Sequence, residues 1–401
     1  MGERVLIVGG GAGGTILANS LDPKRFDVTV LASSPVHLFQ PALLYVAFTG
    51  AHPRATRDEH KLLRRHVRLV QDAATKVDLT DKVVTTSSGT RFDYDAIVVA
   101  TGMAPDPSQI PGLAEVDGRF GDYHTDLAQA EKLWSSLQAF KGGTIAVGQA
   151  SPIVKCPPSP LEGAFLAEEL VGKRGLRQKT RMVFFTPYPR AYPSAPMNEV
   201  VEPIMRARGI EIMEFFDVDR IDPETRTIRS IEGDEIVYDL PIVIPPFVGA
   251  DITYEPADVV NEDRFLITDK ETLQIKGVDR AFAIGDGSNL PTSKAGVGAH
   301  LEAKAVASAL AGHPVRFTGR THCPFDVGYG RGTFVIGSYD APVVKARPTR
   351  VKRLMKMAFE WIYWISLSGV IEPVFNVYFK LTAPKPASAS GSVPESNSSL
   401  N

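Results

Sequence analysis

Residues 4–21 read RVLIVGGGAGGTILANSL, which predicts a buried strand, a glycine turn and a helix in succession. Gly9, Gly11 and Gly14 satisfy the pattern G-x-G-x-x-G directly after the strand. We expect Gly9 to permit the tight turn, Gly11 to let the backbone approach a pyrophosphate, and Gly14 to let the helix pack on the strand. The unpaired N–H groups at the helix start would then face the phosphates. The stretch therefore predicts a dinucleotide site at the beginning of an α/β fold.

Length and composition limit the possible classes of protein. The chain has 401 residues, of which 44% are apolar and 22% are charged, as expected for a soluble globular protein of two or three domains. Its net charge of −2 gives no reason to expect nucleic acid as a partner. Two cysteines, Cys156 and Cys323, are too few for a disulfide scaffold or a four-cysteine metal site, and no metal is predicted. No apolar run is long enough to span a membrane, and a strand beginning by Arg4 argues against a signal peptide, so the cytoplasm is favoured.

The second strand, residues 26–33, departs from the usual dinucleotide pattern. The acidic residue that binds a ribose hydroxyl should stand near its end, and Ala32 occupies that place. The hydroxyl of Ser33 could substitute for the carboxylate, or the serine could simply begin a loop. The sequence leaves both readings open.

A second βα unit begins near Gly143, but its turn has lost its glycines. Only Gly148 remains of a glycine pattern, and Ser151-Pro152 adds bulk and removes an N–H group. The next strand ends in Thr186-Pro187, without an acidic residue or arginine for a ribose. We therefore expect a nicotinamide dinucleotide to bind poorly at this turn.

The same turn carries a cysteine. Residues 154–165 read VKCPPSPLEGAF, and Ser159 with Glu162 predicts a capping box at the start of a helix. Cys156 stands just ahead of that helix, where the helix dipole and Lys155 would stabilise a thiolate. Cys156 could instead be a buried structural residue. Glu162 could only complete the cap, or it could accept a proton near the sulfur.

Two further stretches indicate which dinucleotide binds first. VVATG (98–102), with Thr101 and Gly102, and AFAIGDG (281–287), with Gly285 and Asp286, resemble marks of the two-dinucleotide-binding-domain flavoproteins. The resemblance implies FAD, held without a covalent bond, with Asp286 on its ribityl chain and the helix start near Gly296 facing the flavin. Apart from the resemblance, Asp286 could be a turn aspartate.

The expected organisation is an α/β fold with two Rossmann-like domains, the first of them discontinuous, and a C-terminal amphipathic segment. The expected divisions are 1–115 and 251–318 for the FAD domain, 116–250 for the second domain with its degraded nucleotide loop, 319–381 for the C-terminal segment, and 382–401 for a disordered tail.

From the glycine loop through Cys156, Cys323 and SGVIEPVF (368–375), the chain is similar to the sulfide:quinone oxidoreductase family. The resemblance implies a cytoplasmic or peripheral membrane enzyme in which sulfide reduces FAD and a quinone reoxidises it. It also implies that Cys156 and Cys323 form a sulfur bridge that hydrosulfide attacks, leaving one persulfide and one thiolate that passes electrons to the flavin; we favour Cys323 for that contact. Some members carry a third cysteine where His124 lies here, which points to a two-cysteine subtype. Lys294 could stabilise reduced flavin or protonate quinone, or it could be a solvent-facing loop lysine.

Residues 345–369 begin with basic side chains and continue with apolar and aromatic ones. This pattern is typical of a helix lying in a membrane interface, although a helix packed on the protein's own core would also fit. Phe359 and Tyr363, four positions apart, share one face and are the predicted quinone contacts.

We therefore predict FAD-dependent oxidation of sulfide to polysulfide or sulfur with reduction of a membrane quinone, at the cytoplasmic face of a membrane and in a possible homo-oligomer. The competing hypotheses are a type II NADH:quinone oxidoreductase, a sulfur-chain reductase running the other way, and a flavin-binding redox sensor without turnover.

Overall fold

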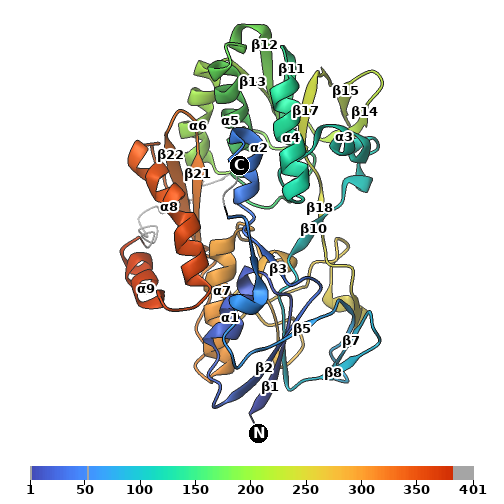
Figure 1. Ribbon diagram of the computed structural model, residues 1–401, viewed down its shortest axis with the longest axis vertical. Helices are drawn as coiled ribbons and strands as arrows, with labels where there is room; N and C mark the ends of the chain where they lie inside the picture. Colours follow the sequence, from blue (N-terminus) through green and yellow to red (C-terminus); the bar gives the residue numbers. More distant parts are fainter. Residues whose placement is uncertain (1, 52–53, 383–401) are drawn as a thin grey trace, which may run out of the picture.

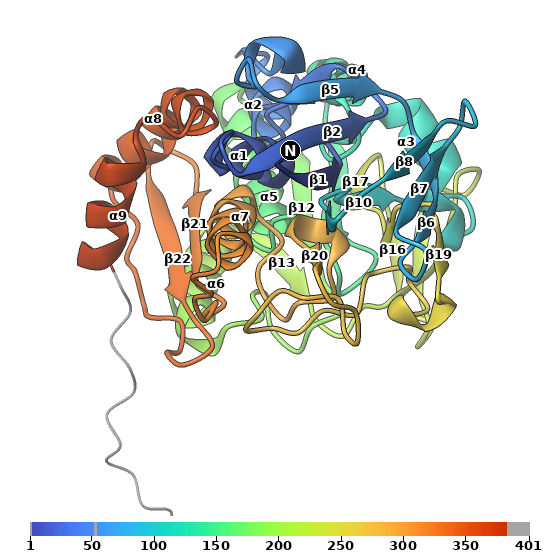
Figure 2. The same ribbon diagram turned by 90° about the horizontal axis from the view of Figure 1, so that it is seen from below.

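The computed structural model describes residues 2–51 and 54–382, and Figures 1 and 2 show it from two sides. It is an α/β protein built on two parallel sheets, with a hairpin and two helices from the C-terminal part of the chain along one side. Apart from Thr382, the tail predicted for 382–401 lies outside the described residues, and the predicted domain boundaries stay a prediction.

The first sheet has the strand order β20-β9-β1-β2-β5, and every neighbouring pair is parallel. Its strands are β1 (Glu3–Val8), β2 (Phe26–Ala32), β5 (Arg68–Gln71), β9 (Ala96–Val99) and β20 (Ala281–Ala283). Their nearly continuous apolar runs suit a sheet that is covered on both faces. Helices α1 (Ala12–Ser20) and α7 (Gly296–Leu310) pack against each other beside it. Because β20 returns to this sheet from far along the chain, the sheet is assembled from two separate parts of the sequence.

The second sheet, β13-β12-β11-β17, is also parallel. Its strands are β11 (Gly143–Gln149), β12 (Thr180–Phe185), β13 (Ile210–Met213) and β17 (Leu240–Ile244), with helices α2 (Ala42–Thr49), α3 (Leu113–Phe120), α4 (Leu127–Ala139), α5 (Ser159–Lys173) and α6 (Ala195–Ala207). Asp126 caps α4 by accepting from the Gln129 amide, and Gly209, at φ +67°, follows the end of α6. The sequence pattern predicts helices over 126–140 and 198–209, and α4 and α6 confirm both within a few residues.

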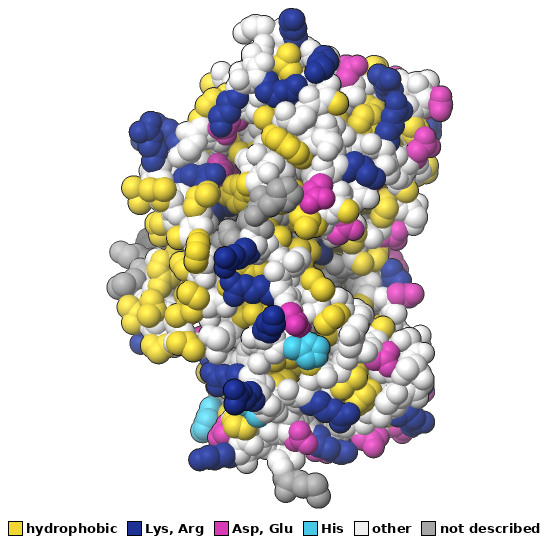
Figure 3. Space-filling view, viewed as in Figure 1, with side chains coloured by type: hydrophobic (Ala, Val, Ile, Leu, Met, Phe, Trp, Pro, Cys, Tyr) yellow, Lys and Arg dark blue, Asp and Glu magenta, His cyan; other side chains and the backbone are white. Residues whose placement is uncertain are grey.

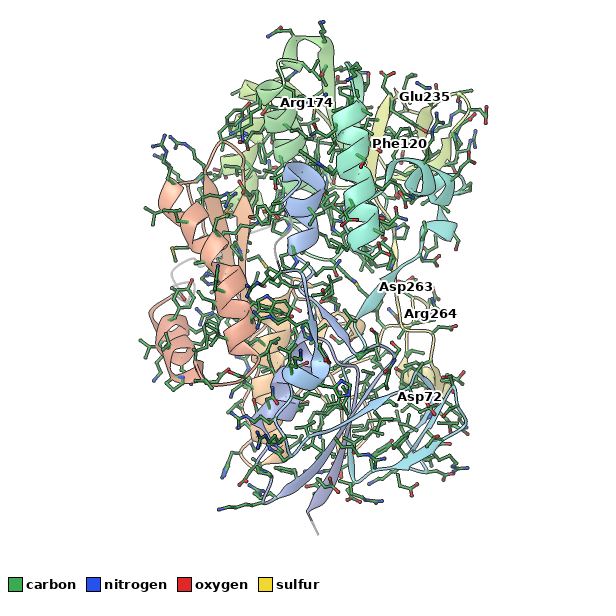
Figure 4. All side chains as sticks on the ribbon, in the orientation of Figure 1. Asp72, Phe120, Arg174, Glu235, Asp263 and Arg264 are labelled. Carbon is green, nitrogen blue, oxygen red and sulfur yellow. The ribbon has the colours of Figure 1, made fainter. Side chains whose placement is uncertain are left out.

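Short antiparallel pieces connect and flank the two sheets. The pair β10 (Met103–Pro105) and β18 (Phe247–Gly249) links them, with Asp263 and Arg264 beside it (Figure 4). The others are β3 (Val36–Leu38), β4 (Thr56–Asp58), β6 (Ala74–Asp78), β7 (Val83–Thr86), β8 (Arg91–Asp93), β14 (Val218–Asp222), β15 (Thr227–Ser230), β16 (Glu235–Val237) and β19 (Thr253–Glu255). The 3₁₀ turns are η1 (Glu59–Lys61), η2 (Pro107–Gln109), η3 (Arg177–Lys179), η4 (Ala257–Val259) and η5 (Gly285–Gly287).

The C-terminal part forms a hairpin of β21 (Thr321–Asp326) and β22 (Gly332–Gly337), followed by α8 (Arg350–Ser366) and α9 (Glu372–Leu381). Helix α8 packs along both strands, and both views place it at the side of the molecule (Figures 1 and 2). The amphipathic helix predicted within residues 345–369 is confirmed. It begins at Arg350 because the Thr349 hydroxyl caps it by accepting from the Lys352 amide. Among the described residues, no helix is both long and apolar enough to cross a membrane.

Candidate functional site

One cavity of 990 Å³ lies where the carboxyl ends of the first sheet face the start of α5 and the C-terminal hairpin. Crevices outside the carboxyl ends of parallel strands are where such folds bind ligands. Of the site residues predicted from sequence, all but Gly14 line this cavity. They are Gly9, Gly11, Ser33, Thr101, Gly102, Cys156, Glu162, Gly285, Asp286, Lys294, Gly296, Cys323, Phe359 and Tyr363.

The glycine loop has the geometry of a pyrophosphate cradle. Gly9 has φ +117°, and a Cβ there would lie 2.3 Å from the Ala100 carbonyl oxygen. A Cβ on Gly11 would meet nothing within 4 Å, so this backbone is open towards the cavity. A Cβ on Gly14 would lie 2.0 Å from the Gly9 carbonyl oxygen, because helix α1 starts tightly against β1. The three glycines thus take the three positions that the motif requires.

A carboxylate does stand beside this loop, although it does not come from β2. Glu59, in η1, is buried and contacts the Thr15 hydroxyl at 2.5 Å and His37 Nδ1 at 2.7 Å. The other ring nitrogen of His37 lies 2.5 Å from the Tyr363 hydroxyl on α8. Sequence reasoning missed Glu59, since its partners are far away in the chain and no local motif marks it. Ser33 lines the cavity, so the reading in which it replaces the missing acid remains a prediction.

Cys156 lies in a tightly held backbone turn. Its φ of +54° is in the left-handed region that non-glycine residues seldom adopt. Its N–H donates to the Lys294 carbonyl at 2.7 Å, and its carbonyl accepts from the Ser159 amide at 2.7 Å. Cys323 on β21 faces the same cavity, with its sulfur 3.2 Å from the Ser293 hydroxyl. Both cysteines are free, and the two adjacent residues Ser293 and Lys294 contact one each.

The predicted capping box is wrong. Helix α5 begins at Ser159 with Pro158 at its N-cap, and no side chain caps it. Glu162 instead accepts a hydrogen bond from buried Lys356 on α8 and another, at 2.6 Å, from the Asp326 amide. A charge-assisted bond to a buried ammonium is stronger than a neutral bond to a helix-start amide, so the distant partner prevails.

The predicted thiolate at Cys156 is also wrong for this state of the protein. Burial raises the pKa of Cys156 well above its ordinary value, and the neighbouring Cys323 and Glu162 raise it further. Burial raises the pKa of Cys323 to about 11, against a lowering by the Ser293 hydroxyl. The cation that favours both thiolates is Lys356, and Lys155 instead lies 5.4 Å from the Phe247 ring. Desolvation therefore outweighs the helix dipole, and both sulfurs are held as thiols.

A buried charge cluster connects the cysteine side of the cavity to helix α8. Lys356 pairs with Glu162, and Arg353 forms an ion pair with Asp326. Tyr45 lies between the cations, its ring 5.3 Å from the Arg353 guanidinium carbon and 5.6 Å from Lys356 Nζ. Burial raises the pKa of Glu162, while the charge of Lys356 lowers it. A carboxyl group whose affinity for a proton is balanced in this way can exchange one with a nearby sulfur.

Charged groups also gather beside Gly285 and the start of α7. Lys294 donates to the Ser288 carbonyl, is half-buried and lines the cavity, so the alternative of a solvent-facing loop lysine is wrong. Glu302, which sequence reasoning missed, accepts from the Gly285 amide at 2.5 Å, and burial raises its pKa to about 7. Burial also raises the pKa of Asp286, while Lys155 and Lys294 lower it. These groups set the charge around the turn that follows β20.

Aromatic side chains close the cavity on the α8 and α9 side, where Phe359, Tyr363, Phe375 and Phe379 line it. The Tyr363 hydroxyl is already engaged by His37, and its ring lies 4.6 Å from that of Phe39. The Tyr363 ring can therefore offer an apolar face to a ligand, whereas its hydroxyl is not free to donate.

We expect His124 to make the protein sensitive to mild acid. It is buried against Tyr123 and Phe247, and burial, with Lys155 nearby, lowers its pKa to about 3. An unfolded histidine titrates near pH 6.5, so its stabilisation is complete above that pH and is lost as pH falls towards the folded pKa. Between pH 7 and pH 5 this amounts to about 2 kcal/mol, at about 1.4 kcal/mol per pH unit.

Denaturant unfolding at both pH values tests this expectation. His124→Gln should lose about 2 kcal/mol less than the parent protein between pH 7 and pH 5, whereas the exposed-site control His313→Gln should keep the parental pH dependence. An equal pH dependence in all three proteins would contradict a neutral, buried His124.

Comparison with known proteins shows the family to which this chain belongs. Residues 3–307 match the family model described as pyridine nucleotide-disulphide oxidoreductase. The chain belongs to this family. It is 27% identical over 386 residues to the mitochondrial sulfide:quinone oxidoreductase of Dictyostelium discoideum, covering 90% of this chain and 85% of that protein.

Two further comparisons bear on the chemistry. The crystal structure of the sulfide:quinone oxidoreductase from Aquifex aeolicus superposes with a TM-score of 0.82 at 22% identity, covering 96% of each chain, which shows a shared fold. The type II NADH:quinone oxidoreductase Ndh of Mycobacterium tuberculosis is 24% identical over 401 residues, covering 91% of this chain and 83% of that one.

The cofactor of this family member is FAD, and the residues present fit it. The cradle of Gly9 and Gly11 suits its pyrophosphate, Asp286 lines the same cavity, and the start of α7 at Gly296 points backbone N–H groups into it. FAD when bound supplies a two-electron acceptor at the centre of this site.

Replacing Gly14 with alanine should lower the affinity of the protein for FAD. The new Cβ would lie 2.0 Å from the Gly9 carbonyl oxygen, which forces α1 away from the cradle. Overpacking of about 1–3 kcal/mol would lower FAD affinity about tenfold or more. Flavin absorbance per protein after gel filtration measures the loss. Gly118→Ala, on an exposed turn of α3 where a Cβ meets nothing within 4 Å, is the matched control, and equal flavin content in both variants would contradict the expectation.

Proposed function

We propose that this protein is a sulfide:quinone oxidoreductase, which oxidises sulfide to polysulfide or sulfur and passes the electrons through FAD to a quinone. The observation that carries the proposal is the placement of two thiols, Cys156 and Cys323, in the cavity that the flavin loop also lines. The similarity to the Dictyostelium and Aquifex enzymes, over nearly the full chain, points to the same reaction.

The chemistry begins on a sulfur bridge between the two cysteines. Hydrosulfide attacks one bridge sulfur, a new S–S bond gives a persulfide on that cysteine, and the other cysteine leaves as a thiolate. Glu162, which lines the same cavity, would take the proton released from hydrosulfide, and the charge of Lys356 would favour the thiolate. The thiolate would then hold the electron pair that FAD, when bound, is able to accept. The neighbouring hydroxyl of Ser293 contacts Cys323, in line with a role for that sulfur on the flavin side.

A nicotinamide dinucleotide is not the electron donor that this site favours. The turn after β11 has lost the glycines that a pyrophosphate needs, and the loop that follows lines the flavin cavity through Lys155 and Cys156. The similarity to the Mycobacterium enzyme makes a type II NADH:quinone oxidoreductase the second candidate function. A redox sensor without turnover is less well supported, since two thiols at a flavin site serve chemistry.

Anaerobic mixing with sulfide, and separately with NADH, tests the proposal. We expect rapid bleaching of the flavin absorbance by sulfide and little by NADH, followed by reoxidation on addition of a quinone. Rapid bleaching by NADH alone would overturn the proposal in favour of the second candidate, and bleaching by neither reductant would favour the sensor.

Helices α8 and α9 would hold the enzyme at the cytoplasmic face of a membrane, as a peripheral protein beside its quinone. Their outer surface, which we call the apolar ridge, carries exposed large side chains that gather at the left edge of Figure 3: Val351, Leu354, Met355, Met357, Trp361, Ile365, Val370, Val374 and Val377. Trp361 is 71% exposed and Leu354 is 68% exposed, which is costly in water and favourable in a lipid interface. The exposed arginines Arg347 and Arg350, near the start of α8, would meet anionic headgroups.

Disrupting the apolar ridge should release the protein from lipid without harming the sulfur site. We expect Leu354→Glu/Trp361→Glu to lower binding to anionic vesicles at least about tenfold, because burying each side chain contributes about 1.5–3 kcal/mol. Flotation with the vesicles measures binding, and flavin bleaching by sulfide in solution should be unchanged. Val237→Glu on β16, equally exposed, is the control. Full vesicle binding by the double variant would refute the ridge as the membrane contact.

A further inference from the structure

A buried histidine–carboxylate contact lies beside the cavity, on other helices than the ion pair of Glu162 with Lys356. His300 lies one turn after Gly296 on α7, so both residues share the helix face that lines the cavity. The Nε2 atom of His300 lies 2.9 Å from a carboxylate oxygen of Glu372, the first residue of α9. The other carboxylate oxygen lies 3.5 Å from Lys304, one further turn along α7. No part of the sulfur chemistry uses these three residues.

The pair is oriented in a way that leaves one ring nitrogen available. The contact with the Glu372 carboxylate favours a proton on Nε2 and leaves Nδ1 as the ring nitrogen that can face a ligand. Among the described residues, none hydrogen-bonds Nδ1, and His300 lines the cavity wall. The Phe375 ring stands edge-on at 5.2 Å and fixes the plane of the imidazole.

The surroundings of His300 suit a flat, apolar ligand. Phe359, Phe375 and Phe379 line the same part of the cavity, and α8 and α9 carry the apolar ridge on their outer side. A quinone entering from a lipid surface would therefore pass between these helices, with aromatic rings on its faces and His300 as the cationic N–H donor on the α7 side.

We propose that His300, oriented by Glu372, is the proton donor to a quinone oxygen in this cavity. The inference rests on the proposed function and names a residue for its second half, the reduction of the quinone. Reduction of a quinone takes up two electrons and two protons. Bound FAD in its reduced form would supply both electrons and one proton, and His300 in its protonated form would supply the second proton, its N–H bond breaking as the quinol O–H bond forms. His300 then regains a proton from water at the cavity mouth.

Glu372 and Lys304 act through His300 and are positioning residues. The Glu372 side chain is 12% exposed, and its contacts with His300 and Lys304 lower its pKa against the effect of burial, so it remains a carboxylate. The side chain of Lys304 is 36% exposed and reaches solvent, where it balances the charge of the carboxylate. A neutral amide in place of Glu372 would leave the imidazolium without its counter-ion.

The test reduces the holoenzyme with dithionite, without sulfide, and mixes it anaerobically with decylubiquinone while the flavin absorbance is followed. His300→Ala should slow reoxidation about 100-fold, as the loss of a general acid does, and added imidazole should restore part of the rate. Glu372→Gln should slow it by a smaller factor, and Glu372→Asp should recover. The exposed-site control His313→Ala should behave as the parent protein.

A second measurement separates proton donation from mere packing. Titration of each holoprotein with the quinone analogue heptyl-hydroxyquinoline N-oxide, followed by tryptophan fluorescence, gives an affinity that involves no turnover. We expect that affinity to stay within about threefold in His300→Ala, which is under 1 kcal/mol. Bleaching by sulfide should also be unchanged.

The outcomes distinguish the two proposals. Parental reoxidation rates in His300→Ala, or a loss of analogue affinity as large as the loss of rate, would overturn the role of His300 and leave the proposed function standing. A parent protein that decylubiquinone does not reoxidise would overturn the quinone half of the proposed function itself.

Discussion

Replacing Cys156 with serine is expected to abolish bleaching of the flavin by sulfide. The sulfur bridge cannot form without this atom, and a serine hydroxyl neither forms a persulfide nor leaves as a stable anion in a buried site. Cys323→Ser should have the same effect, because both sulfurs are needed for one exchange. We expect the rate of bleaching in a stopped-flow experiment to fall by a factor of about 10³ or more, in the range seen when an enzyme loses its nucleophile.

The backbone of Cys156 offers a sharp control for this experiment. Its φ of +54° strains any side chain, and glycine adopts that conformation freely. Cys156→Gly should therefore fold, bind flavin and be bleached by dithionite like the parent, while failing with sulfide. If Cys156→Gly or Cys323→Ser retained the parental rate with sulfide, the bridge would have to be removed from the mechanism.

Lys356→Met should destabilise the fold by about 3–5 kcal/mol, since it leaves the Glu162 carboxylate buried without its partner. Lys356 also contacts the Tyr45 ring, and its positive charge lowers the pKa of both cysteines. The variant should therefore react more slowly with sulfide even where it is fully folded. Urea unfolding gives the first effect, and the rate of flavin bleaching gives the second.

The double variant Glu162→Gln/Lys356→Met separates the two effects. Removing both charges should recover most of the lost stability, because replacing a complete buried ion pair is close to neutral. The rate with sulfide should stay low, as the proton acceptor and the cation are both gone. A single Lys356→Met variant as stable as the parent would show that the pair is not held as two charges in the folded protein.

Local patterns predicted much of this molecule. The loop from Gly9 to Gly14, helix α4 behind Asp126 and the amphipathic helix α8 all follow from spacing within one or two turns, and the structure confirms them. The turn at Cys156 could be found for the same reason. Cys156 lies in a strand–turn–helix unit whose turn lacks the glycines expected of a dinucleotide site.

The partners of these residues could not be predicted, because they come from distant parts of the chain. Glu162 appeared to be a capping residue until the structure placed Lys356, 194 positions later, against it. The pairing of His37 with Tyr363 spans 326 positions, and no motif marks it. The prediction of a thiolate at Cys156 failed for a similar reason. A helix start is visible in the sequence, whereas the burial of the sulfur, which outweighs the effect of the helix dipole on its pKa, is a property of the whole fold.

The position of helix α8 has a practical consequence for anyone preparing this protein. A C-terminal helix with many exposed apolar side chains is an obvious segment to delete when a more soluble sample is wanted. Yet this helix supplies Arg353 to Asp326, Lys356 to Glu162 and Tyr363 to His37. A chain cut before Arg350 would therefore leave Asp326 and Glu162 buried without their cations, His37 without its hydroxyl partner, and an open wall on the cavity. Solubility is better sought by exchanging the outward-facing side chains one at a time.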